Sequence, residues 1–114
     1  MTCADLVVDC RLRAATELLA HQWDPLVLAA LRSGPRRRGD LRASIGPISD
    51  KVLTETLRRV LANGLVERSG SHNRADYALT ALGLSLVEGP LAALGAWITE
   101  HGEELLEAQE AATA

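Results

Sequence analysis

Residues 49–68 read SDKVLTETLRRVLANGLVER and contain one amphipathic helix with a signal at each end. Ser49 belongs to the residue types that cap helix N-termini. The apolar side chains recur at helical spacing on one face, at Leu53, Leu57, Val60 and Leu61. Asn63-Gly64 predicts the end of the helix, because glycine takes the left-handed C′ conformation and Leu65 can then fold back on the last turn. The opposite face is polar, so this helix has a core side and an exposed side.

Three shorter helices are expected before this segment. Helical spacing of leucine and alanine predicts the first over residues 11–21. Asp24 followed by Pro25 predicts an N-cap with proline at the first helical position, in a second helix that ends near Gly34. Residues 36–45 are expected as a third helix with its arginines outward. A Gly-Pro turn separates this third helix from the amphipathic one.

The hydrophobic period changes after the amphipathic helix. Two short apolar segments around a polar loop predict a β-hairpin over about residues 65–79. Thr80 can cap a following helix, Gly89-Pro90 marks a kink or a fresh start, and a last helix is expected from residue 90 to about 109. This order of elements predicts a mainly α winged helix-turn-helix with a small β-hairpin wing. We expect one domain, residues 1–114, with the helix-turn-helix at about 36–63.

Charge is strongly segregated along the chain, although the whole chain carries only −3. Ten of the twelve Lys and Arg residues lie between residues 32 and 74, against four acidic residues, so this part carries +6. The parts before and after it carry −2 and −7. A basic segment between acidic flanks suits polyanion binding, whereas the alternative is an ordinary solvated face. With two Trp, one Tyr and no Phe, base stacking on several rings is poorly supported, so duplex DNA is favoured over RNA.

The helix-turn-helix order assigns roles to these polar residues. The second helix of such a motif lies in the major groove, with its exposed side touching base edges. The candidates for base readout are Lys51, Thr54, Glu55 and Arg58. Lys or Arg could donate to guanine, Glu55 could accept from cytosine N4, and the Thr54 hydroxyl could serve base or phosphate. The candidates for phosphate and wing contacts are Arg36, Arg37, Arg38, Arg42, Ser49, Arg59, His72, Asn73 and Arg74.

Several segments resemble successive signatures of the HxlR family. They are residues 10–23 (CRLRAATELLAHQW), 34–37 (GPRR), 48–57 (ISDKVLTETL), 63–68 (NGLVER), 77–83 (YALTALG) and the later Trp97. The resemblance implies a bacterial winged-helix transcriptional regulator, related to MarR proteins, that binds operator DNA as a homodimer. The chain departs from the family where Ala20-His21-Gln22 replaces a Gly-Gly-Lys and where the wing lacks a proline pair.

The last helix carries apolar residues at a spacing of three and four, typical of a helix pair. From spacing alone, packing on the chain's own core is equally consistent. The resemblance implies instead that the first and last helices, about 11–21 and 90–109, form the dimer interface. The expected interface residues are Leu12, Leu91, Leu94, Trp97, Ile98, His101 and Leu105.

Cys10 stands where many HxlR proteins carry a cysteine, which in some of them senses oxidants or electrophiles. The resemblance therefore makes Cys10 a candidate sensor, although a small buried residue without redox function is an open alternative. An intrachain bridge to Cys3 is not expected, because seven helical residues span about 10 Å.

Taken together, we expect a sequence-specific DNA-binding repressor that binds a pseudo-palindromic operator as a homodimer, with a redox or small-molecule effector. The alternative is a winged-helix protein-interaction module without specific DNA binding. An enzyme is not expected, because nothing pairs Cys10 with a base and no Gly-rich phosphate loop or metal-ligand spacing occurs. Neither cofactor nor metal is expected. Without a signal peptide or an apolar stretch of about 20 residues, the protein is expected in the cytoplasm.

Overall fold

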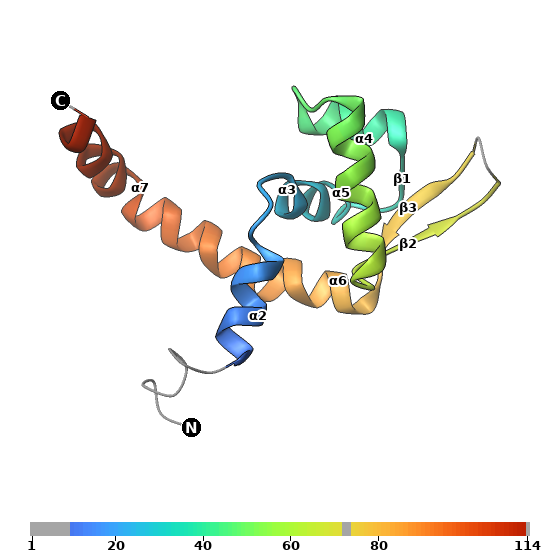
Figure 1. Cartoon of the computed structure of the whole chain (residues 1–114), viewed down its shortest axis with the longest axis horizontal. Helices are drawn as coiled ribbons and strands as arrows, with labels where there is room; N and C mark the ends of the chain where they lie inside the picture. The colour runs from blue at the N-terminus through green and yellow to red at the C-terminus, as the bar shows by residue number, and fades with distance from the viewer. Residues whose placement is uncertain (1–9, 72–73, 114) are drawn as a thin grey trace.

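The computed structural model describes residues 10–71 and 74–113. Its elements are, in chain order, α2 (Cys10–Leu18), α3 (Trp23–Ala30), β1 (Arg36–Arg37), α4 (Arg38–Ile45), α5 (Asp50–Ala62), β2 (Val66–Ser69), β3 (Asp76–Leu79), α6 (Ala81–Leu86), the π-helical segment η1 (Val87–Leu91) and α7 (Ala92–Thr113). Helices α3, α4 and α5 gather beside the sheet, the β2–β3 hairpin projects as a wing, and α7 extends away on the other side (Figure 1). The mainly α winged helix-turn-helix expected from the sequence is confirmed.

Local sequence signals set both ends of α5. The Ser49 Oγ accepts a hydrogen bond of 3.1 Å from the Val52 N–H at the start of the helix. At its end Gly64 has φ +73°, and the Leu65 N–H returns to the Val60 carbonyl at 3.0 Å. This is the bonding pattern of a Schellman motif, which satisfies carbonyls that the helix end would leave unpaired.

The core lies where α3, α4 and α5 meet the base of the wing. Helix α5 contributes Leu53, Leu57 and Val60 to it, as its spacing predicted. The remaining buried apolar residues are Val27, Leu28, Leu31, Leu41, Ile48, Leu65, Val66 and Val87. Because Val87 belongs to η1, the start of the C-terminal helix is anchored in this same core.

The helix expected from residue 36 begins instead at Arg38. Arg36 and Arg37 form β1, which pairs with β3 in antiparallel register, Arg36 opposite Tyr77 and Arg37 opposite Asp76. The sheet therefore has three strands in the order β1-β3-β2, not two. So short a strand has no hydrophobic alternation of its own, and its pairing with β3 decides its conformation.

The first two helices also differ from expectation at their boundaries. Helix α2 ends at Leu18, and residues 19–22 form a turn before α3. Asp24 was expected as an N-cap, but α3 already begins at Trp23, and the Asp24 side chain is buried within the fold. Its carboxylate has a different partner, described below.

Residues Ala81–Thr113 run as one continuous helical stretch. Thr80 caps it as predicted, because its Oγ1 accepts from the Gly83 N–H at 3.1 Å and donates to the Gly64 carbonyl at 2.7 Å. Pro90 does not end the helix but lies within η1, where the wider π turn accommodates its missing N–H. Gly83 packs so closely on the turn after α5 that a Cβ at this position would collide with the Leu65 carbonyl oxygen.

By length and composition this stretch could also cross a membrane. An 18-residue window within it has a mean hydropathy of 1.5, and only 11% of that window is buried in the chain. The expectation that no apolar stretch reaches membrane length therefore does not hold for this helix. An exposed apolar surface of this kind is typical of an interaction site.

Candidate nucleic-acid interface

The face of α5 opposite the core carries the predicted base-reading residues. Lys51, Thr54, Glu55 and Arg58 are all exposed, whereas Leu53 and Leu57 on the other side are buried. Within the described part of the chain, Lys51 and Arg58 make no side-chain hydrogen bond or ion pair. Both cations therefore remain available to an external anion or acceptor.

Thr54, in contrast, already has partners within the protein. Its Oγ1 donates to the Asp50 carbonyl at 2.9 Å and accepts from the Arg38 Nη2 at 2.6 Å. The same Arg38 nitrogen contacts the Asp50 carbonyl at 2.8 Å and the Asp50 Oδ1 at 2.9 Å. Arg38, Asp50 and Thr54 thus form one network that ties the first residue of α4 to the first turns of α5.

Arg42 strengthens the same junction. Its Nε donates to the Ile48 carbonyl at 3.3 Å, and its Nη1 lies 3.7 Å from the Asp50 Oδ1. The hydrogen bond from Arg38, together with the charges of Arg38 and Arg42, holds the pKa of Asp50 below its ordinary value. Two arginines predicted to meet phosphates therefore also bind the turn of the helix-turn-helix.

Arg59, a predicted phosphate contact, has a partner within the protein. Its Nη2 lies 2.8 Å from the Asp24 Oδ1 and its Nε lies 3.1 Å from the Asp24 Oδ2, a bidentate ion pair. The Asp24 residue is only 4% exposed, and the hydrogen bond that it accepts raises the pKa of Arg59. Arg59 lies at the edge of the polar face and turns toward α3, where it neutralises a buried carboxylate.

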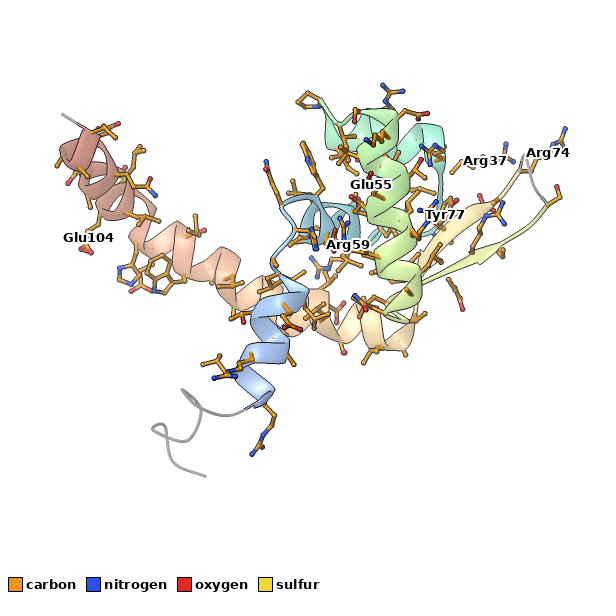
Figure 2. All side chains as sticks on the ribbon, in the orientation of Figure 1. Arg37, Glu55, Arg59, Arg74, Tyr77 and Glu104 are labelled. Carbon is orange, nitrogen blue, oxygen red and sulfur yellow. The ribbon has the colours of Figure 1, made fainter. Side chains whose placement is uncertain are left out.

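The remaining predicted phosphate contacts surround the wing. Arg37 lies beside the hairpin, and Arg74 lies at its far end, while Glu55 marks the exposed face of α5 (Figure 2). Arg37 is 3.8 Å from Asp76 in an exposed ion pair, and Arg36 donates to the Ser33 Oγ at 3.1 Å. The side chain of Arg74 has no partner among the described residues. His72 and Asn73 lie outside the described residues.

A concave surface between α4 and the wing contains a basic residue that the sequence left without a role. The concavity has a volume of about 520 Å³ and is lined by Arg37, Arg38, Gly39, Asp40, Arg68, Ala75 and Tyr77. Arg68 stands directly opposite Tyr77 in the β2–β3 pairing. Side chains alternate between the two faces of a hairpin, and paired residues share one face. Pairing Arg68 with Tyr77 in the predicted hairpin could therefore have placed Arg68 on this concave surface.

The terminal helices carry an apolar surface far from the wing. No residue of α7 is buried, and the expected interface residues Leu94, Trp97, Ile98 and Leu105 are exposed, with Leu91 and His101 half-buried. The rings of Trp97 and His101 lie 5.0 Å apart. Leu12 of α2 is exposed as well. Glu104, on α7, marks the end of the molecule opposite Arg74 (Figure 2).

Cys10 is the first residue of α2, and its side chain lies outside what the structure describes. Among residues 10–71 and 74–113, no three or more His, Cys, Asp or Glu side chains gather where they could hold a metal ion.

A helix-turn-helix with an exposed polar helix face, an adjoining wing and basic side chains around both defines the class of winged-helix DNA-binding proteins. The HxlR-like helix-turn-helix family matches residues 18–106, and the chain belongs to this family. It is a transcriptional regulator of the helix-turn-helix type, as its relatives are.

Three relatives illustrate the likeness. The HTH-type transcriptional regulator YtfH of Escherichia coli is 34% identical over 101 residues, which cover 86% of this chain and 79% of that protein. The solved structure of YtfH from Salmonella typhimurium is 31% identical with a TM-score of 0.71, covering 86% of this chain and 89% of that one. The quinone-bound structure of YodB from Bacillus subtilis is 30% identical with a TM-score of 0.70, covering 79% and 97%.

Proposed function

We propose that this regulator is a homodimeric repressor that binds a pseudo-palindromic operator. The observation that carries the proposal is a pair of cations on the exposed face of α5, Lys51 and Arg58, whose side chains have no partner within residues 10–71 and 74–113. Glu55 lies between them on the same helix, and Arg74 extends the basic surface to the end of the wing. Such a surface would suit α5 to a major groove and the wing to the adjoining backbone or minor groove. We propose that the protein acts in the cytoplasm, where it would meet its DNA partner.

A second copy is the proposed cover for the apolar surface of α7. None of the 22 residues of α7 is buried. Even its large apolar side chains are exposed, and Ile98 and Trp97 expose 50% and 49% of their surface. Exposed apolar patches of this kind mark interaction sites. Two-fold pairing through α2 and α7 would set the two α5 helices roughly 34–36 Å apart, one turn of DNA.

Cys10 is proposed as the sensor of an oxidant or electrophile. The support is its position at the start of α2, within the proposed dimer interface, and the relative YodB, which has been solved with quinone bound. Modification of a thiol at an interface between subunits would change their relative placement and therefore the spacing of the two α5 helices. Diamide or a quinone should then alter the DNA affinity of the wild type and leave the DNA affinity of Cys10→Ser unchanged.

A gel shift against the DNA upstream of the protein's own gene tests the proposal. We expect a shifted complex at moderate salt that excess random duplex does not compete away, with two chains per duplex. Inserting five base pairs between the half-sites turns one of them by about half a helical turn, so binding should weaken sharply. Binding that ignores sequence and half-site spacing would contradict the proposal. Salt-insensitive association with a protein instead of DNA would favour the interaction module.

A further inference from the structure

The hydroxyl group of Thr54 is committed within the free protein. Its hydrogen is donated to the Asp50 carbonyl at 2.9 Å, and its oxygen accepts from the Arg38 Nη2 at 2.6 Å. A threonine hydroxyl has one hydrogen to donate, so Thr54 has none left for a base acceptor. Yet Thr54 is exposed, on the same helix face as Lys51 and Arg58.

What an exposed threonine with a committed hydroxyl still offers is its γ-methyl group. In the major groove the 5-methyl group of thymine is the base feature that apolar side-chain atoms recognise. Resting on the proposed binding of α5 in the major groove, we propose that Thr54 reads a thymine through its γ-methyl group. Arg38 is then a positioning residue, which keeps the Thr54 hydroxyl turned toward Asp50.

The network has a reason to persist on DNA. Asp50 is the first residue of α5, and its exposed carboxylate would face phosphate charge if it lost its partners. Arg38 and Arg42 neutralise it at 2.9 Å and 3.7 Å. Turning the Thr54 hydroxyl toward a base would break two hydrogen bonds. One of them comes from the charged Arg38 guanidinium, and hydrogen bonds with a charged partner are stronger than neutral ones. If Thr54 contacts the base through its methyl group instead, both hydrogen bonds stay intact.

A uracil scan of the operator tests the proposal. Selection from a random duplex pool first supplies the operator, and each thymine is then replaced singly by uracil, which lacks only the 5-methyl group. For the wild type, one position in each half-site should weaken binding about fourfold, the value of burying one methyl group. Thr54→Val keeps a γ-methyl and loses the hydroxyl, so it should retain this discrimination. Thr54→Ser keeps the hydroxyl and loses the methyl, so it should bind both duplexes equally.

Arg38 has its own readout in the same assay. In Arg38→Ala the Thr54 side chain is free to rotate, so discrimination between thymine and uracil should fall. Adding Thr54→Val should restore it, since valine presents a methyl group in place of the hydroxyl, and a merely structural role for Arg38 would give no such rescue. Loss of discrimination in Thr54→Val, no uracil-sensitive position, or no rescue would overturn the proposal. If selection enriches no sequence at all, the proposed function fails as well, and the two failures are thus told apart.

Discussion

Asp24 and Arg59 form a bidentate ion pair that joins α3 to the helix proposed to read DNA. The carboxylate is buried and the guanidinium is about two-thirds buried, with the Nη2 to Oδ1 distance at 2.8 Å. The two residues are 35 positions apart in the chain. The orientation of α5 on the core therefore depends on a polar contact as well as on Leu53 and Leu57.

Loss of Arg59 is expected to destabilise the fold by about 3 kcal/mol, because it leaves the buried Asp24 carboxylate without its partner. The adjacent Arg58→Met is the matched control, since Arg58 is exposed and has no partner among the described residues. Urea unfolding of Arg59→Met and Arg58→Met measures the difference. Equal midpoints for the two variants would show that the ion pair contributes nothing to stability.

Gly83→Ala is expected to cost about 2–3 kcal/mol, because the added Cβ meets the backbone carbonyl of Leu65, which cannot rotate away. Gly39→Ala is the control. No atom lies within 4 Å of the Cβ it would add, and alanine favours a helix over glycine by up to about 1 kcal/mol. Thermal unfolding compares the two. A Gly83→Ala variant as stable as Gly39→Ala would refute the close packing of α6 on this turn.

Acid should weaken the junction between α4 and α5. Arg38 lowers the pKa of Asp50 from its ordinary value of 3.8, so the ionised carboxylate stabilises the folded state above that value. This contribution is lost as the pH falls through the lowered pKa. Asp50→Asn should therefore show a shallower loss of thermal stability than wild type between pH of about 5 and about 2. Superimposable pH profiles would speak against the Arg38–Asp50 contact.

Ile98→Glu is expected to separate the proposed dimer, because it places a charge in the exposed apolar stripe of α7, next to Leu94 and His101. Ala96→Glu is its control, since the helical period places residue 96 on the opposite face, with Glu103. Sedimentation analysis should find Ile98→Glu monomeric and Ala96→Glu dimeric. A monomeric wild type would contradict the proposal that a second copy covers α7. Binding of that monomer to lipid vesicles would then indicate that a membrane covers this helix.

Local signals were sufficient to predict the elements whose ends are set by neighbours in the chain. Helix α5 is the clearest case, with the Ser49 cap, the Gly64 turn and the apolar face all within one segment. Strand β1 was missed because its two residues take their conformation from β3, about forty positions later.

The different roles of the arginines also depend on contacts between residues that are far apart in the chain. Arg58 and Arg59 are adjacent and chemically identical, and only the position of Asp24 in space separates their roles. The available signal was Asp24 itself, an isolated acid in the apolar segment WDPLVLAA, because a buried carboxylate requires a cationic partner. The sequence is likewise consistent with a Thr54 hydroxyl that contacts base or phosphate, and only the fold brings Arg38 to that hydroxyl.

Equilibrium binding of wild type, Arg58→Ala and Arg37→Ala to selected operator and to random duplex, over a range of salt, is the decisive measurement. Arg58→Ala should weaken operator binding by about 1–3 kcal/mol and relax the sequence preference, while it changes random binding far less. Arg37→Ala should weaken both duplexes alike and reduce the salt slope by about one. If Arg58→Ala weakens operator and random duplex equally, α5 does not read bases through Arg58 as proposed.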